Sequence, residues 1–213
     1  MAINLTKGQT IDLRKNDRGE DVYDLSQVTI GLGWDVKETK SGFLGKLFGG
    51  KEEDYDLDAV AFLLDETGKI QNLGVDLKKG DIIFFNSLKH PSGQIWLTGD
   101  NRTGEGDGDD EQIIVRLNTL PEKYQKIIFL VTIYQGRQKN QHFGKVDNAF
   151  IRAVDAKGKE IAKFSLSGNE SLNGKCSMIF SEVYRHNNNW KFRAIGDAKD
   201  TDSILDLLKL YTN

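Results

Sequence analysis

Short apolar segments separated by Gly, Asn and Asp turns dominate the hydrophobic pattern of this chain. Segment 28–34 alternates with a period of two, which predicts a strand with one buried face. Segments 59–64 and 82–85 are continuously apolar, as is typical of strands buried on both faces. Segment 127–134 is rich in β-branched and aromatic residues and is predicted as the central strand. Further predicted strands are 94–98, 113–117, 149–154, 161–166, 177–184 and 190–195, with a turn at 187–189 between the last two.

The C-terminal pattern differs from the rest, because its apolar residues recur at helical spacing. A helix is predicted over about 202–211, with an apolar face made by Ile204, Leu205, Leu207, Leu208 and Tyr211. With 2 prolines, many strands and one helix, the expected fold is mostly β. We expect a β-sandwich of about ten strands with a short C-terminal helix. The expected organisation is one domain over 1–196 and a helical tail over 197–213 packed on it.

Composition supports a folded domain without a membrane anchor. Of 213 residues, 38% are hydrophobic and 29% charged, which is enough for one sizeable core. No apolar run reaches the length of a membrane span, and the first residues lack the pattern of a secretory signal. Cys176 is the single cysteine, which excludes an internal disulfide and suits a reducing cytosol. No basic footprint for nucleic acid is present.

The most informative stretch of the chain covers positions 99–111 and has the sequence GDNRTGEGDGDDE. It holds six carboxylates and one arginine, so its own net charge is −5. The whole chain has a net charge of −3, so the residues outside this stretch sum to about +2. Two carboxylates about 5 Å apart repel by roughly 3 kcal/mol at an effective dielectric near 20. A compact loop of this kind needs a compensating cation, and Ca²⁺ tolerates the most oxygen ligands and the loosest geometry. The alternative is a solvated acidic turn without a ligand, which most charge runs are.

The candidate metal ligands fall into three groups. The first group comprises the oxygen-bearing side chains of this acidic loop. They are too many for one ion, so two neighbouring Ca²⁺ ions are expected. The second group is a pair of acids two residues apart, which share a face in a strand and could reach an ion if that strand end adjoins the loop. The third is Asp35. The predicted ligands are Asp100, Asn101, Glu105, Asp107, Asp109, Asp110 and Glu111, together with Asp56 and Asp58.

Other site chemistries fit this chain less well. The acidic loop lacks the closing Glu and the flanking helices of an EF-hand, and its acids would repel a phosphate. Paired acids could serve glycoside hydrolysis, but that needs a fixed separation and one raised pKa. His90, His142 and His186 show no zinc spacing. No catalytic residue is predicted.

The low-complexity segment 41–51 contains Phe43, Leu44, Leu47 and Phe48 among glycines and lysines. One interpretation is a loop whose apolar side chains partly cover the core. The other is a small docking element for a membrane surface or a partner.

Several motifs in order resemble the TerD family of tellurium-resistance and general stress proteins. They are GLGWD at 31–35, YDLDAVAFLL at 55–64, the acidic loop, FGKV at 143–146, AFIR at 149–152, EVYRHN at 182–187 and WKFRAIG at 190–196. The resemblance covers about 3–196, and the chain departs from shorter members in the insertion at 41–54 and in the tail.

The resemblance implies a bacterial, cytoplasmic, Ca²⁺-binding β-sandwich that acts with partners rather than as an enzyme. The implied partners are other stress-resistance proteins, including ones at the membrane, which would associate the protein with it indirectly. Two other functions remain open. One is a Ca²⁺-dependent membrane-surface adaptor in the manner of C2 domains, and the other is a metal-dependent hydrolase.

Overall fold

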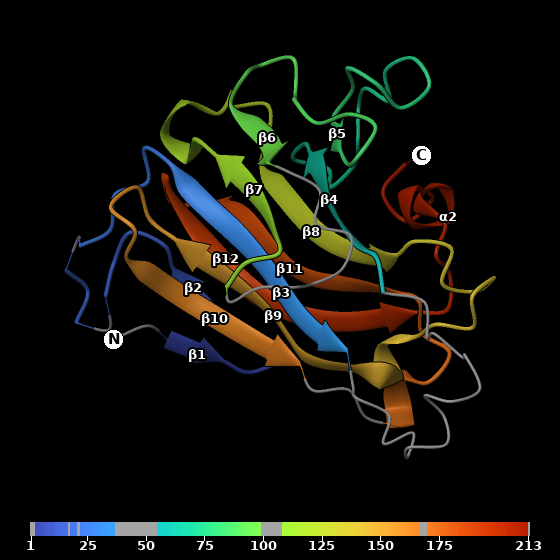
Figure 1. Ribbon diagram of the computed structural model, residues 1–213. Helices are drawn as coiled ribbons and strands as arrows, with labels where there is room; N and C mark the ends of the chain where they lie inside the picture. The colour runs from blue at the N-terminus through green and yellow to red at the C-terminus, as the bar shows by residue number, and fades with distance from the viewer. Residues whose placement is uncertain are drawn as a thin grey trace.

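The computed structural model describes residues 3–16, 18–20, 22–36, 55–98, 108–166 and 170–212. Segment 41–51, with its predicted loop or docking element, lies outside these residues. The described chain forms two six-stranded sheets that pack face to face (Figure 1). The prediction of a mostly β, sandwich-like fold is therefore confirmed.

Sheet A forms the front layer in Figure 1. Its strands, in spatial order, are β1 (Ile3–Leu5), β10 (Glu160–Leu166), β9 (Val146–Val154), β3 (Val28–Val36), β7 (Glu111–Val115) and β6 (Ile95–Thr98). Every neighbouring pair is antiparallel except β1 and β10, which run parallel. Strand β3 lies between β9 and β7, and its Leu32 pairs with Glu111 at the start of β7, so the C-terminal part of β3 lies beside the end of the acidic loop.

Sheet B forms the rear layer, and all its pairs are antiparallel. Its strands, in spatial order, are β2 (Thr10–Asp12), β12 (Asn189–Lys199), β11 (Ser177–His186), β8 (Lys126–Ile133), β4 (Leu57–Leu64) and β5 (Ile82–Ile83). The strand predicted as central, β8, lies between β11 and β4. The predicted turn joins β11 to β12 through Asn187 and Asn188, whose φ angles are 48° and 60°, as a tight hairpin turn requires.

Two apolar clusters explain the burial pattern. The larger lies between the sheets, and the smaller lies on the outer face of sheet B beneath the C-terminal segment. Strand β4 contributes to both: Ala59 and Ala61 face the first cluster, whereas Val60 and Phe62 face the second. Its continuous apolar run is thus explained by burial on both faces, as predicted.

The C-terminal helix and one strand are shorter than expected. The described helix α2 covers Ile204–Leu208, with the Ser203 side chain accepting from the Asp206 backbone N–H. The chain then continues in turns to Tyr211, whose ring meets Phe62 edge-on at 5.8 Å. Strand β5 ends at Ile83 because Phe84 and Ser87 exchange backbone hydrogen bonds in a tight turn. The described residues also include three short 3₁₀ turns at Leu117–Thr119, Phe143–Lys145 and Glu170–Leu172.

Strands β1 and β2 were not predicted. Each has three residues, which is too short for an alternation to stand out from a loop. Both lie at sheet edges and exist because a distant strand, β10 or β12, offers them backbone partners. With them, the described chain has twelve strands rather than about ten.

A buried polar network ties the sheets together at the end of β4 opposite to the acidic residues. Asp81 Oδ1 accepts from the Tyr124 hydroxyl at 2.7 Å and lies 3.2 Å from His90 Nε2. All three side chains are buried. His90 Nδ1 is 2.8 Å from the Ser92 hydroxyl and accepts from the Ser92 backbone N–H. The hydrogen-bonding groups are thus mutually satisfied, as a buried network requires.

Acid should weaken this network. Burial raises the pKa of Asp81, but hydrogen bonds from His90, Tyr124 and the Asn72 backbone outweigh it, so the pKa is lowered overall. The stabilisation is therefore present above the ordinary Asp pKa of about 4 and is lost as pH falls through the lower folded value. Asp81→Asn should cost about 1–2 kcal/mol at pH 6, and the gap to the wild type should narrow below about pH 4. Urea unfolding across pH 3–6 measures this.

The matched control is Asp76→Asn, which changes an exposed acid in the same connection. It should follow the wild-type pH dependence. A constant gap between Asp81→Asn and the wild type over the whole pH range would contradict the role of the Asp81 charge.

Candidate metal centre

Acidic residues from three strands gather at one end of the sandwich. Strand β3 ends there with Asp35 exposed, β7 begins there with Glu111, and β4 begins there with Asp58. The register places Leu32 of β3 opposite Glu111, which explains why the end of one strand meets the start of the other. The end of β6 at Thr98 and the first described residue of the acidic loop, Gly108, flank the same region.

Asp109 occupies a hollow on the outer face of sheet A. The hollow exists because β3 carries glycine at 31 and 33, and a Cβ on Gly31 would overlap the Asp109 carboxylate. The Asp109 side chain is 2% exposed, and Arg152 Nε donates to its Oδ1 at 2.7 Å. Gln112 Nε2 donates to the other oxygen at 3.2 Å. Asp109 is therefore engaged with a protein cation.

Arg152 is held from two sides. Its Nη1 lies 3.1 Å from Glu160 Oε2 on β10, while its Nε contacts Asp109. The hydrogen bond to Asp109, followed by that to Glu160, raises the pKa of the guanidinium against the opposing effect of burial. The arginine thus links three neighbouring parts of sheet A, and it remains charged at any physiological pH.

Asp110 is partly buried beside two other acids. Its backbone N–H donates to the Leu32 carbonyl at 2.8 Å, and its Oδ2 accepts from the Trp34 backbone N–H at 3.0 Å. Burial raises the pKa of Asp110, and the charges of Asp35 and Asp109 raise it further. A nearby cation would favour the charged carboxylate of Asp110 and so lower its pKa.

Glu111 joins the two sheets beside this site. Its side chain is buried and accepts a short hydrogen bond from the backbone N–H of Ala59 on β4. The start of β4 therefore adjoins the end of the acidic loop, which is the condition under which Asp56 and Asp58 could reach an ion there. Asp58 is 5% exposed, and Asp56 lies one residue before β4 with its carbonyl accepting from Tyr134 N–H at 2.8 Å.

The predicted ligand set is only partly described. Asp100, Asn101, Glu105 and Asp107 lie outside the described residues. In the part of the chain that the structure describes, no group of three or more His, Cys, Asp or Glu side chains is arranged to hold a metal ion. A complete ligand shell at this end would therefore have to include residues of the acidic loop.

Sequence reasoning missed the supporting parts of this site. Arg152 was noted within a motif but not assigned to Asp109, and the role of Gly31 and Gly33 was not anticipated. The available signal was the pair of glycines inside a strand pattern, which often marks a close approach of other groups. At Gly33, an added Cβ would meet the Phe150 ring and the Gly108 carbonyl.

Comparison with known proteins decides the family. A model of the TerD domain matches residues 1–211. The chain belongs to the TerD family. This confirms the resemblance seen in the motifs over about 3–196, and the match extends further, into the tail.

The chain is similar over its whole length to curated TerD-family proteins. It is 57% identical to tellurium resistance protein TerX of Serratia marcescens, over 99% of this chain and 100% of that protein. It is 40% identical to stress response protein SCP2 of Bacillus subtilis, with coverage of 99% and 100%. The chain is thus a member of a bacterial tellurium-resistance and stress-protein family.

A solved structure agrees with the fold. The crystal structure of a homologue of telluride resistance protein (TerD) from Streptomyces coelicolor A3(2) superposes with a TM-score of 0.63. The identity is 21%, over 88% of this chain and 98% of that one, so the likeness concerns the fold alone. Separately, none of the helices in the described residues is long and apolar enough to cross a membrane.

Proposed function

We propose that this TerD-family protein binds calcium, with room for two ions, and works as a non-enzymatic binding module in a bacterial stress response. The family supplies the stress-response setting. The metal proposal rests on the chain's own residues at the acidic end of the sandwich.

One observation carries the metal proposal. Asp110 is partly buried beside two other carboxylates, Asp35 and Asp109, and its pKa is raised as a result. Arg152 offsets the charge of Asp109 on the outer face of sheet A. The loop that precedes Asp109 adds further acids in sequence. A divalent cation would relieve the repulsion among them.

The donor chemistry favours calcium over other metals. The candidate donors are carboxylate oxygens and the Asn101 amide, and oxygen-only sets suit hard cations. Mg²⁺ retains water and resists all-protein cages, whereas Ca²⁺ accepts six to eight oxygens in a flexible arrangement. Within the proposal, the ions are bound by Asp110, by the pair Asp56 and Asp58, and by the acidic-loop residues Asp100, Asn101, Glu105 and Asp107. Asp109 and Glu111 hold the end of the loop through Arg152 and Ala59.

The proposed absence of catalysis follows from the state of the acids. A hydrolase needs a carboxyl group poised beside substrate, whereas Asp109 is ion-paired and Glu111 bonds a strand backbone. Calcium-dependent turnover of phosphoester or glycoside panels that vanishes in an acidic-loop variant would contradict this part. We further propose action in the cytoplasm with other stress-resistance proteins, some at the membrane.

Asp110→Asn should weaken calcium binding by about tenfold or more without destabilising the calcium-free protein. The amide oxygen can still accept from the Trp34 N–H, while loss of the charge removes both a strong ligand and a source of repulsion. Isothermal titration with calcium and thermal unfolding of the calcium-free protein give the two readouts. A variant that only damaged the fold would lower both the calcium affinity and the melting temperature of the calcium-free protein.

The matched control is Glu66→Gln, which removes an exposed acid just beyond the opposite end of β4. It should bind calcium as the wild type does. Equal calcium affinity in Asp110→Asn and the wild type would remove Asp110 from the ligand set. No calcium binding by the wild-type protein would refute the metal proposal altogether.

A further inference from the structure

The carboxylate of Asp109, at the end of the acidic loop, is hydrogen-bonded on both of its oxygens. Arg152 Nε on β9 donates to Oδ1 at 2.7 Å, and Gln112 Nε2 donates to Oδ2 at 3.2 Å. Arg152 is itself held from β10, because its Nη1 lies 3.1 Å from Glu160 Oε2. The Asp109 side chain is therefore fixed to the outer face of sheet A by groups from neighbouring strands.

The position of Asp109 also limits the position of the next residue, Asp110. The Cα atoms of two successive residues are about 3.8 Å apart, so Asp110 cannot move far while Asp109 is fixed. In this place the Asp110 N–H donates to the Leu32 carbonyl at 2.8 Å, and its Oδ2 accepts from the Trp34 N–H at 3.0 Å. Without the anchor, part of this ordering would have to occur when an ion binds, and ordering costs entropy.

The charge of Arg152 acts in the opposite direction to its hydrogen bonds. A guanidinium group repels a divalent cation, so the loss of one positive charge near the site would by itself strengthen calcium binding. The loss of the anchor would weaken it, because Asp110 would be less well ordered before binding. The two effects differ in sign, and a measured calcium affinity distinguishes them.

We propose that Arg152 is a positioning residue of the calcium site. Although it is a cation, it strengthens the binding of calcium, because it anchors Asp109 and thereby holds Asp110 in the place where it meets the ion. Asp109 is then the anchor of the loop end and not a ligand. This inference rests on the proposed calcium function and adds a residue that determines the affinity of the site without touching the ion.

The decisive variant combines Asp109→Asn with Arg152→Gln in the full chain. It removes one negative and one positive charge, so the net charge of this region is unchanged and no buried charge is left unpaired. Isothermal titration of the metal-free protein with calcium should give an affinity at least about tenfold lower than that of the wild type, because the anchor is lost. The unchanged net charge alone would predict an unchanged affinity.

Arg152→Gln alone separates the anchor from a direct ligand role of Asp109. It should also bind calcium more weakly than the wild type, although it removes a positive charge. If Asp109 were a ligand of the ion, this variant would free its carboxylate and strengthen binding. Stronger binding in Arg152→Gln would therefore overturn the inference.

Hydrogen exchange of the calcium-free protein tests the positioning without any metal. The Asp110 N–H, which donates to the Leu32 carbonyl, and the Trp34 N–H, which donates to Asp110, should exchange at least about tenfold faster in the double variant. The N–H of Val131, within β8 in the middle of sheet B, should exchange as in the wild type. An equal acceleration at Val131 would mean that the whole fold is loosened, and would overturn a specific positioning role.

Lys163→Gln is the matched control for charge on the same face of sheet A. Lys163 lies directly opposite Arg152 in the pairing of β10 with β9, and its Nζ is 3.8 Å from the centre of the Phe150 ring. The variant removes one positive charge and leaves the hydrogen bonds of Asp109 in place. It should bind calcium at least as tightly as the wild type.

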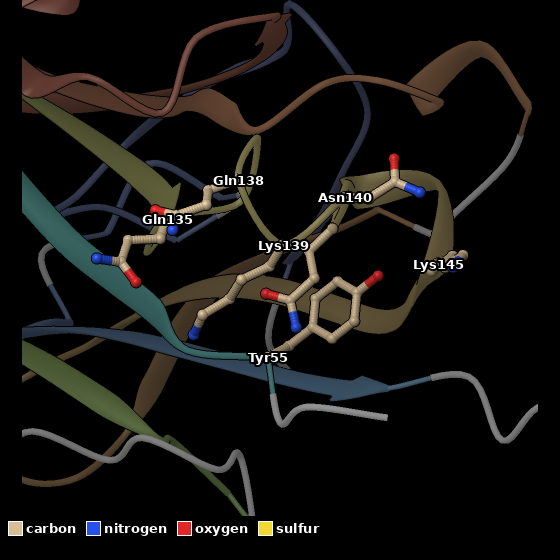
Figure 2. Close-up of a pocket in the computed structure, with 7 residues that line it drawn as sticks. Tyr55, Gln135, Gln138, Lys139, Asn140 and Lys145 are labelled. Carbon is tan, nitrogen blue, oxygen red and sulfur yellow. The ribbon is translucent and has the colours of Figure 1, made fainter. Parts of the chain in front are cut away.

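Lys145→Gln is a second control, on another side of the acidic end. Lys145 precedes β9, whose first residue Val146 pairs with Val36 at the end of β3. It lines a polar cavity of about 460 Å³ beside Tyr55, and no carboxylate is among the lining residues (Figure 2). This variant too should bind calcium at least as tightly as the wild type, because the anchor of Asp109 is intact.

The outcomes separate this inference from the proposed function. Calcium binding by the wild type that is unchanged in the double variant would overturn the role of Arg152 and leave the calcium function standing. A loss of affinity in Lys163→Gln as large as that in Arg152→Gln would also overturn it, because any cation of this face would then have the same effect. A wild-type protein that does not bind calcium would refute the proposed function itself.

Discussion

Calcium is expected to raise the melting temperature of the metal-free protein by about 5–10 °C. At a free concentration of about 100 times the dissociation constant, one site adds roughly 2.7 kcal/mol to the stability of the folded state. For a chain of this size, each kcal/mol corresponds to about 2–4 °C. The physical reason is that a bound cation compensates for the burial of the Asp110 carboxylate and for its repulsion by Asp35 and Asp109, which together raise the pKa of Asp110. Differential scanning calorimetry at several calcium concentrations measures the shift.

Magnesium is the control for general ionic effects. It should give a smaller shift at the same concentration, because it sheds its water reluctantly. The shift with calcium should continue to grow with concentration above saturation, as linkage requires. An identical melting curve with and without millimolar calcium, starting from verified metal-free protein, would rule out the proposed site.

Gly31→Ala should lower the free energy of unfolding by about 3 kcal/mol. The added Cβ would occupy the position of the Asp109 carboxylate, so the carboxylate would have to leave Arg152. Separating a largely buried ion pair costs about 3–5 kcal/mol when a partner is left uncompensated, and Glu160 retains part of the compensation here. Urea unfolding of the metal-free protein gives the free energy directly.

A double-mutant cycle shows whether Asp109 is the cause. In an Asp109→Ala background the hollow beside Gly31 is empty, so Gly31→Ala should cost less than about 1 kcal/mol. Thr29→Ala, an outward-facing change on the same strand, controls for effects on the strand itself. An equal cost of Gly31→Ala in both backgrounds would show that the strand backbone, not the Asp109 carboxylate, is disturbed.

The strands that the sequence predicts well are those whose burial is complete or regular. Strand β4 was predicted from a continuous apolar run, and the two clusters on either side of it supply the reason. The turn at Asn187 and Asn188 was predicted because these residues tolerate a left-handed backbone. Local chemistry was sufficient in each case, since no distant residue had to be known.

The contacts that sequence analysis missed depend on strand order. Asp109 and Arg152 are 43 residues apart and meet because β3 separates β7 from β9 while offering only glycine at their level. The network of Asp81, His90 and Tyr124 likewise joins three connections at one end of the sandwich. No periodicity in the chain encodes such pairings. The acidic loop was recognisable from its composition. Composition does not tell that Asp109 is paired with Arg152 of a distant strand.

The pairing of the first two strands has a consequence for the order of events during synthesis. Ile3 of β1 pairs with Ala162, and Ile11 of β2 pairs with Phe192. Chains are made from the N-terminus, so β1 and β2 leave the ribosome well before β10 and β12. Before β10 and β12 are synthesised, β1 and β2 have no strand edge to pair with. A nascent chain halted before Glu160 would therefore hold β1 and β2 as unpaired segments, available to chaperones or to proteolysis.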